Sequence, residues 1–454
     1  MNTPSGMLTL NQLRSMVEAG EIDTVLVAIT DMQGRLQGKR CTARFFLDEV
    51  ARHGTEGCNY LMAVDVEMNT VDGFAMSSWE RGYGDLLMRP DINTLRRIPW
   101  YPATALVLCD AVWLDGSPVI ASPRQILRRQ LERLDDLGYD AYAATELEFQ
   151  LFNNSYEDAS RRAYRDLEAS SQYNIDYSMI GTGRVELLLR DVRNGMAGAG
   201  MYVETAKGEC NLGQYEIGFR YDIALTTCDN HSLYKTGAKE IAAGHGKSIS
   251  FMAKYDEREG NSCHIHFSLR SKAGDAVCAG DRKHGFSPLM EHFLAGQIAC
   301  MEELTYFFAP NINSYKRFMP GSFAPTAIAW GIDNRTCALR VVGHGESLRL
   351  ENRVPGADVN PYLAVAALIA AGLHGVENEL PLEAAYEGNA YASDRVHVPS
   401  TLRDAAAKLE GSELARKVFG DEVIDHYLNA ARVELAAFDA AITDWERARG
   451  FERL

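Results

Sequence analysis

One short segment, residues 145–152, constrains the fold of this 454-residue chain more than any other. Its sequence, TELEFQLF, alternates polar and apolar residues without a break, which is typical of a β-strand with two different faces. The apolar face carries Leu147, Phe149 and Leu151, and the polar face carries Glu146, Glu148 and Gln150. The two carboxylates then stand roughly 7 Å apart along the strand. Taken alone, this could be a half-exposed strand with an acidic face in water.

Two further strand-like segments repeat the pattern with other ionisable groups. Residues 263–269 place His264, His266 and Ser268 on one face, and residues 348–353 place Arg349, Glu351 and Arg353 on one face. A lone histidine is more often a core or surface residue than a ligand. Carboxylates combined with an imidazole, and without a thiolate, suit a hard divalent cation such as Mg²⁺ or Mn²⁺. The whole set therefore indicates a metal site, although no single member does.

A second acidic pair and a group of arginines extend the pattern. Glu209 and Glu216 are seven positions apart, which would place them on opposite faces of a straight strand, so we expect a turn at Gly213. Four arginines follow downstream, at positions 317, 335, 340 and 353. They could be solvated surface charges. Phosphoryl transfer also needs such cations, because ATP and the transferring group carry more negative charge than metal ions alone neutralise.

The order of predicted elements divides the chain into two parts. The β-branched run 24–30 and the segment 36–41 predict a hairpin around Gly34 in a β-rich N-terminal part. After residue 115 the character changes, because Ser122 and Pro123 begin a leucine-rich helix that ends at Gly138. Strands then alternate with helical stretches such as 229–243 and 361–372. We expect an α+β fold with domains at 1–115 and 116–454.

Composition excludes several classes of function. No apolar run is long enough to cross a bilayer, and the N-terminus lacks the pattern of a secretory signal. The nine cysteines include no C-x-x-C pair, which favours reduced thiols and a cytoplasmic location. A formal net charge of -16 makes nucleic acid and anionic lipid unlikely partners, whereas an acidic cleft attracts metal ions and ammonium groups.

Seven motifs resemble, in the same order, those of type I glutamine synthetases: TELEFQLF, GQYEIGFRY, GNSCHIH, NSYKRFMPG, NRTCALR, LRLENR and NPYLAVAAL. The resemblance covers essentially the whole chain. It implies an N-terminal β-grasp domain and a catalytic domain with a curved antiparallel sheet and flanking helices. It also implies ATP and glutamate as substrates, with two or more Mg²⁺ or Mn²⁺ ions in each site. Twelve subunits would stack as two hexameric rings, each active site lying between a catalytic domain and a neighbour's N-terminal domain.

The resemblance also assigns roles to individual residues. The metal facing glutamate would be held by Glu148, Glu209 and Glu216, and the metal on the ATP phosphates by Glu146, His264 and Glu351. Glutamate would contact Arg317, Arg353 and Gly260, and the transferring phosphate would contact Arg335, Arg340 and His266. The nucleotide would contact Glu204, Tyr221, Ser268 and Arg349. Asp72, with Trp79 near it, matches the group that deprotonates the incoming ammonium.

Two departures from the family pattern bear on the amine. Phe74 and Ala75 stand where two serines are usual, which weakens the match at Asp72. Phe323 stands where glutamine synthetases carry a flap glutamate, so a charge that favours ammonium has become an apolar ring. This is similar to the γ-glutamylamide-forming branch of the family, above all the actinobacterial γ-glutamylethanolamide synthetases. Ethanolamine is therefore the expected amine, and a polyamine, another alkylamine or plain ammonium are the alternatives.

Two questions remain open at this level. Some members of the family are structural or regulatory proteins without activity, but all six metal positions here hold potential ligands. Tyr391 lies near the position where regulated members carry an adenylylated tyrosine, although an exposed loop tyrosine is the simpler interpretation. We expect the six predicted ligands to converge on one cavity, because two-metal phosphoryl transfer requires it.

Overall fold

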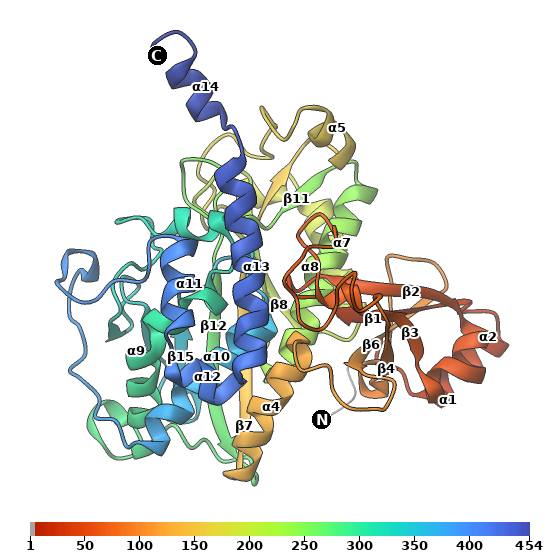
Figure 1. Cartoon of the computed structure of the whole chain (residues 1–454), viewed down its shortest axis with the longest axis horizontal. Helices are drawn as coiled ribbons and strands as arrows, with labels where there is room; N and C mark the ends of the chain where they lie inside the picture. Colours follow the sequence, from red (N-terminus) through yellow and green to blue (C-terminus); the bar gives the residue numbers. More distant parts are fainter. Residues whose placement is uncertain (1–4) are drawn as a thin grey trace.

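The computed structural model describes residues 5–454 and contains two β-sheets (Figure 1). The smaller sheet has the strand order β2-β1-β6-β4-β3, with β5 paired to β6. Its strands are β1 (Thr24–Thr30), β2 (Leu36–Thr42), β3 (Thr55–Cys58), β4 (Asp85–Pro90), β5 (Arg96–Arg97) and β6 (Thr104–Val112). The short helices around it are α1 (Leu10–Glu18), α2 (Ala43–Phe45), η1 (Phe46–Val50), α3 (Ala51–His53), η2 (Asn59–Met62) and η3 (Ile92–Thr94).

Strand β1 shows how this first part attaches to the rest of the molecule. It forms the predicted hairpin with β2, and Gly34 in the turn has a φ of 81°, which an L side chain rarely adopts. Val25 and Val27 point into a core confined to the N-terminal part. Ala28, on the other face, joins the core of the larger domain. Both faces of the strand are therefore buried, and the N-terminal part packs firmly on the larger domain of the same chain.

The larger sheet has the order β13-β14-β15-β12-β7-β9-β8, with β10 and β11 also paired to β7. All its pairs are antiparallel except β13 with β14. Its strands are β7 (Tyr139–Phe152), β8 (Val203–Gly208), β9 (Gln214–Phe219), β10 (Asp222–Ile223), β11 (Ser248–Ser250), β12 (Cys263–Ser271), β13 (Trp330–Ile332), β14 (Leu339–Val342) and β15 (Arg349–Asn352). The curved sheet with flanking helices confirms the predicted α+β fold.

Long helices cover one face of this sheet. Helix α10 (Pro361–Glu377) is apolar on all sides, and it is buried against α9 (Pro288–Phe308), α4 (Pro123–Asp136) and α8 (Ala224–Gly244). Helices α4 and α8 in turn pack on β7. The shorter helices are α5 (Tyr156–Arg161), α6 (Met179–Gly183), α7 (Glu186–Gly198), η4 (Lys283–Gly285), η5 (Ile312–Arg317), η6 (Gly345–Ser347) and η7 (Ala390–Ala392). The opposite face of the sheet is left for polar side chains.

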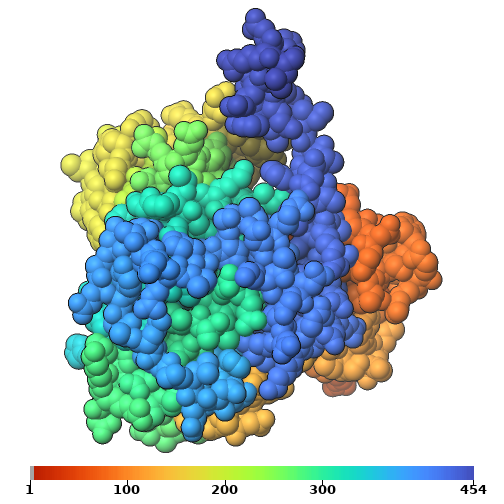
Figure 2. All heavy atoms as spheres, turned by 60° about the vertical axis from the view of Figure 1, so that its left-hand side comes forward, coloured from red at the N-terminus to blue at the C-terminus, as the bar shows by residue number. Residues whose placement is uncertain are grey.

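The C-terminal helices complete the molecule. They are α11 (Leu402–Glu410), α12 (Glu413–Phe419), α13 (Asp421–Ala440) and α14 (Asp444–Gly450). Figure 2 shows α14 standing clear of the body of the molecule. All nine cysteines are free thiols. Within residues 5–454, no helix combines the length and apolar composition that crossing a membrane demands.

A buried ionic network joins the two parts of the chain. Arg124 on α4 pairs with Asp91 (2.7 Å), Asp110 (2.5 Å) and Asp229 (2.9 Å). The first two aspartates belong to the N-terminal part and Asp229 belongs to α8. Removing one partner of such a buried pair leaves an uncompensated charge, so the network fixes how the parts fit together. The predicted domain boundary after residue 115 lies between β6 and α4 and stays a prediction.

Candidate active site

The register of the large sheet gathers ionisable side chains on one face. His264 on β12 lies directly opposite Glu146 on β7, and His266 lies opposite Glu351 on β15. On the other side of β7, Glu148 lies opposite Glu216 on β9. Side chains at directly opposed positions share a face and approach closely. Antiparallel pairing therefore brings together residues that are up to 205 positions apart, from Glu146 to Glu351.

The first cluster combines two carboxylates with two imidazoles. His266 Nε2 lies 2.9 Å from Glu146 Oε1, and His264 Nδ1 lies 3.3 Å from Glu146 Oε2 and 3.5 Å from Glu351 Oε1. Burial raises the pKa of Glu146, but hydrogen bonds from His264 and His266 outweigh burial and lower it. The oxygen and nitrogen atoms of Glu146, His266 and Glu351 lie close enough to hold one ion. His266 thus enters the cluster beside His264, the predicted ligand, whose role stays a prediction.

The second cluster consists of carboxylates alone. Oxygens of Glu148, Glu209 and Glu216 all lie within 4.8 Å of one another. Burial and then the charge of Glu148 raise the pKa of Glu209 to about 8. Burial and the charges of three glutamates raise the pKa of Glu216 well above its usual range. A bound cation would relieve this crowding of negative charge, and oxygen ligands are those that Mg²⁺ and Mn²⁺ prefer. The donor set therefore fits a divalent metal.

Three residues support the second cluster and were not identified from the sequence. Glu148 accepts hydrogen bonds from the amide (2.7 Å) and hydroxyl (2.5 Å) of Ser262 and from the amide group of Gln214 (2.9 Å). The ammonium group of Lys207 pairs with Glu209. Gln214 could have been found, because it shares a strand face with Glu216. Lys207 could also have been found, because it lies two positions before Glu209, whereas Ser262 meets Glu148 from 114 positions away.

The arginines predicted to bind glutamate, Arg317 and Arg353, line the same cavity as the two carboxylate clusters. Arg317 is buried and donates to the carbonyls of Val354 (2.8 Å) and Arg353 (3.1 Å). Burial lowers its pKa to about 10, because desolvation disfavours the charged guanidinium. A side chain at Gly260 would collide with the carbonyl of Ala253 and press on Arg317. The chain can therefore pass beside Arg317 only with glycine at this position.

Two further arginines were predicted to contact the transferring phosphate. Arg340 pairs with Glu351 at 2.7 Å and with Asp333 at 2.5 Å, while Arg353 also pairs with Glu351. Arg335 lines the same space as Arg340. Burial raises the pKa of Glu351, but His264 and the surrounding cations outweigh burial and lower it.

Most of these groups line one cavity of about 920 Å³. Its walls include the six predicted metal ligands, Glu146, Glu148, Glu209, Glu216, His264 and Glu351. They also include Arg317, Arg335, Arg340, Arg353, Gly260 and Phe323. The structure thus brings together the residues predicted for metal, glutamate and phosphate, except His266, which touches the cavity through Glu146. Their individual roles stay predictions.

The residues predicted to contact the nucleotide do not line this cavity. Arg349 Nε donates to His266 Nδ1 at 3.2 Å, so it adjoins the first cluster. Ser268 lies opposite Tyr142 in the sheet, and the Tyr221 ring meets the Tyr142 ring edge-on at 6.0 Å. Glu204 is exposed on β8. None of these four residues lines the cavity, although Ser268 and Tyr221 both adjoin Tyr142 and Arg349 adjoins the first cluster.

Asp72 and Trp79 do not reach this cavity within the same chain. The carbonyl of Asp72 accepts a hydrogen bond from Asn429 on α13 (2.9 Å), on the N-terminal side of the molecule. Trp79 is 72% exposed and packs edge-on against Tyr83 at 5.1 Å. Neither residue is among those lining the cavity. A role in this chemistry requires that another copy of the chain supply them.

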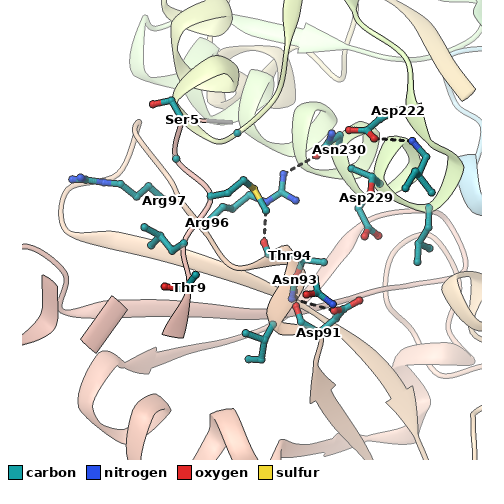
Figure 3. Close-up of a pocket in the computed structure, with 18 of the residues that line it drawn as sticks. Ser5, Thr9, Asp91, Asn93, Thr94, Arg96, Arg97, Asp222, Asp229 and Asn230 are labelled. Atoms are coloured by element: carbon teal, nitrogen blue, oxygen red, sulfur yellow. Dashed lines mark hydrogen bonds between the residues drawn. The ribbon is translucent and has the colours of Figure 1, made fainter. Parts of the chain in front are cut away.

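A larger cavity of about 1640 Å³ lies between the two parts of the chain (Figure 3). Arg96 crosses it and donates to the carbonyl of Thr94 (2.9 Å) and to the side chain of Asn230 (2.7 Å). Asp91 and Asp229 in its wall are already neutralised by Arg124. The Arg96–Asn230 hydrogen bond and the ion pairs of Arg124 join the two parts of the chain, and among residues 5–454 no group of three potential metal ligands lines this cavity. The smaller cavity is therefore the candidate active site.

Comparisons with known proteins show what this chain is similar to. Residues 120–449 match the model of the family described as glutamine synthetase, catalytic domain. The chain is 65% identical to the γ-glutamylethanolamide synthetase of Streptomyces coelicolor over 98% of its length and 96% of that protein. It is 39% identical to a glutamate–isopropylamine ligase of a Pseudomonas species, covering 96% and 97% of the two chains. The solved ADP complex of GmaS matches with a TM-score of 0.85 at 28% identity, over 97% and 99% of the two chains.

Proposed function

The chain belongs to the glutamine synthetase family, and on that premise we propose that it joins the side-chain carboxylate of glutamate to a primary amine with cleavage of ATP. The product is a γ-glutamylamide, and ethanolamine is the favoured amine. The observation that carries this proposal is the combination of two carboxylate clusters and four arginines in one cavity, with Phe323 at its rim.

The chemistry proceeds in two steps. The γ-carboxylate of glutamate attacks the terminal phosphorus of ATP, ADP leaves, and γ-glutamyl phosphate forms. The amine nitrogen then attacks the acyl carbon, phosphate leaves, and the amide remains. Arg317 and Arg353 bind the carboxylates of glutamate, while Arg335 and Arg340 neutralise charge that develops on the transferring phosphoryl group.

Divalent metal ions are the natural complement of the two carboxylate clusters. Glu148, Glu209 and Glu216 would hold one ion, and Glu146, Glu351 and the adjacent histidines would hold another. Bound there, such ions supply positive charge next to phosphate oxygens. The crowding of Glu148, Glu209 and Glu216 supports this assignment, because it raises the pKa values of Glu209 and Glu216 even though Lys207 pairs with Glu209.

The flap favours an amine that carries carbon. Phe323 is 57% exposed at the cavity rim and presents an aromatic face where a carboxylate would attract bare ammonium. Relatives at 65% and 39% identity are named for ethanolamine and isopropylamine. A relative at 32% identity is named for putrescine. The higher identity to the ethanolamide synthetase makes ethanolamine the first choice.

The amine must lose a proton before it attacks, and Asp72 is the proposed base. Because Asp72 lies outside this chain's own cavity, a neighbouring copy would deliver it, with Trp79 beside it. A dodecamer of two hexameric rings, as in the type I enzymes, would place the N-terminal part of one subunit at the site of the next. Each isolated subunit would then hold an incomplete site.

The test is a panel of amines supplied with glutamate, ATP and Mg²⁺, with phosphate release and the mass of the product both measured. We expect ethanolamine to give the highest kcat/KM and a product of the mass of γ-glutamylethanolamide. Preference for ammonium at equal concentration would instead identify a glutamine synthetase. Absence of phosphate release with every amine would identify a member of the family that has lost catalysis.

A further inference from the structure

Asp333 does not line the candidate active site, but it holds one edge of the Arg340 guanidinium, which does. Asp333 Oδ1 accepts hydrogen bonds from Arg340 Nε at 2.9 Å and from Arg340 Nη2 at 2.5 Å. Glu351 Oε2 accepts a hydrogen bond from Nη1 of the same guanidinium at 2.7 Å. The side chain of Glu351 is fully buried, whereas that of Asp333 is 68% exposed. One carboxylate therefore holds Arg340 from inside the protein and the other holds it from the solvent side.

These hydrogen bonds leave one part of the guanidinium free. A guanidinium carries one N–H donor on Nε and two on each Nη, all in a rigid plane. Asp333 takes the donor on Nε and one on Nη2, and Glu351 takes one on Nη1. One donor on Nη1 and one on Nη2 therefore remain for a ligand in the cavity. Because the plane is rigid, the two carboxylates also fix the direction of these remaining donors.

The backbone at Asp333 directs the carboxylate back toward Arg340. Asp333 directly follows β13, and its φ of 50° lies in the left-handed region, which aspartate adopts more readily than most residues. Its amide donates to the carbonyl of Val341 on β14 at 3.0 Å. Arg340 precedes Val341 on that strand, so this bond places the Asp333 side chain beside Arg340.

The residue after Asp333 anchors this turn without any help from Arg340. Asn334 Nδ2 donates to the carbonyl of Gly388 at 2.9 Å. Asn334 Oδ1 accepts hydrogen bonds from the amide of Thr336 at 3.0 Å and from its hydroxyl at 2.7 Å. In η7, just beyond Gly388, the hydroxyl of Tyr391 is buried, which corrects the interpretation of Tyr391 as an exposed loop residue. The carboxylate of Asp333 is therefore carried on a fixed turn.

Without Asp333, the guanidinium of Arg340 would have Glu351 as its carboxylate partner. Two parallel hydrogen bonds to one carboxylate are the stronger form of this contact. An Arg340 released from Asp333 would therefore turn further onto Glu351. That movement would withdraw the free donors from the cavity and would compete with a metal ion for Glu351, a member of the first cluster.

We propose that Asp333 is a positioning residue, which holds the Nε and Nη2 edge of Arg340 so that the remaining donors face the transferring phosphoryl group. The same contact keeps Arg340 from closing on Glu351. Asp333 acts only through Arg340, so this role rests on the function proposed above.

Two substitutions at Asp333 separate the acceptor from the charge. Asp333→Gly removes the acceptor and keeps the left-handed backbone, which glycine adopts readily. Asp333→Asn keeps an Oδ1 acceptor and removes the charge. Glu379→Gly is the matched control, because Glu379 is an exposed carboxylate with a φ of 49° and does not line the cavity.

Three measurements on the full-length enzyme test the proposal. The first is steady-state kinetics of amide formation, with kcat and KM for glutamate determined separately. The second is rescue of Asp333→Gly by formate, with sodium chloride at the same ionic strength as the control. The Asp333 side chain is exposed, so a small carboxylate can reach the position that it vacates. The third is a comparison of crystal structures of the wild type and Asp333→Gly.

For Asp333→Gly we expect kcat to fall about tenfold, which corresponds to about 1.4 kcal/mol of activation free energy, with KM for glutamate unchanged. Asp333→Asn should lie between Asp333→Gly and the wild type, and Glu379→Gly should match the wild type. Formate should raise kcat several-fold in Asp333→Gly alone. In the crystal structure of Asp333→Gly, the guanidinium of Arg340 should lie turned onto Glu351.

Equal kcat values for Asp333→Gly and Glu379→Gly, or a loss that formate does not reverse, would overturn the positioning role. An Arg340 guanidinium in the same place in both crystal structures would also overturn it. If the wild type forms no amide, the proposed function fails, whereas the two crystal structures still decide whether Asp333 positions Arg340.

Discussion

Glu148 and Glu216 occupy directly opposed positions on β7 and β9, so two carboxylates face each other across one rung of the sheet. Like charges in this relationship destabilise a sheet. We predict that Glu216→Gln raises or preserves the melting temperature in metal-free buffer but removes most of the increase that Mg²⁺ or Mn²⁺ gives the wild type. Thermal unfolding with and without metal checks this, with Glu132→Gln, an exposed change on α4, as the control. An undiminished metal effect in Glu216→Gln would remove Glu216 from the ligand set.

Gly260 is predicted to be irreplaceable for binding of glutamate. A methyl group at this position would collide with the carbonyl of Ala253 and displace Arg317. We expect Gly260→Ala to raise KM for glutamate about tenfold or more, the effect of losing roughly 1.4 kcal/mol of binding, and to change KM for ATP little. Gly244→Ala, where a methyl group meets nothing within 4 Å, is the control. Equal KM values for glutamate in the two variants would contradict the role of this loop.

Much of the framework could be predicted from the sequence, because the local patterns there are strong. The alternation in residues 145–152 predicted the second half of β7, and the pair Ser122-Pro123 with Gly138 marked the ends of α4. The turn at Gly213 followed from the odd spacing of Glu209 and Glu216, and the structure has it. In each case a period or a turn residue within a few positions determines the structure.

The remaining features depend on contacts between distant segments. The hydrogen bonds from Ser262 to Glu148 join residues 114 positions apart, and the burial of the Tyr391 hydroxyl depends on which way its loop packs. Period two places His264 and His266 on the same face, so it cannot decide which imidazole lies nearer to Glu146. That choice depends on side-chain conformations within the finished sheet.

Asp72 provides a prediction about assembly, because it does not line the cavity of its own chain. We expect Asp72→Asn and Glu351→Gln each to reduce activity strongly, since one variant lacks the base and the other lacks a metal ligand. Co-expressed in one oligomer, the two variants should recover about a quarter of the wild-type activity, because random pairing restores that share of sites. Amide formation by the purified mixed oligomer is the measurement. A mixture no more active than its parts, or a fully active monomer, would exclude sharing of the site between subunits.

We expect His426, which lies outside the active site, to make the stability of the protein depend on pH. Burial lowers its pKa to about 4, and it packs between Phe74 and the sulfur of Met32, where the two parts of the chain meet. An unfolded histidine titrates near pH 6.5, so the unfolded chain binds more protons between about pH 6.5 and 4. The part of the free energy of unfolding that depends on neutral His426 is therefore fully present above pH 6.5. It is lost as the pH falls toward 4, and the total loss is on the order of 3 kcal/mol.

We expect His426→Gln to flatten the fall in melting temperature between pH 7.5 and pH 5. The exposed His53→Gln should keep the wild-type slope. Melting curves of both variants and the wild type at several pH values provide the check. Parallel curves for all three proteins would show that His426 does not contribute to this transition.

The last prediction concerns Phe323, since the choice of amine depends on the flap. An ethanolamine or alkylamine tail adds methylene groups, and each one that the flap buries contributes about 0.8 kcal/mol, a several-fold preference over ammonium. Phe323→Glu restores a negative charge at the rim and removes the apolar contact. We therefore expect the ratio of kcat/KM for ethanolamine to that for ammonium to fall by about tenfold or more. Phe323→Leu is the matched control, because it keeps an apolar side chain without adding charge, and its ratio should stay near that of the wild type. If Phe323→Glu and Phe323→Leu shift the ratio equally, loss of the ring rather than the charge sets the preference. If neither shifts it, amine selection resides elsewhere in the cavity.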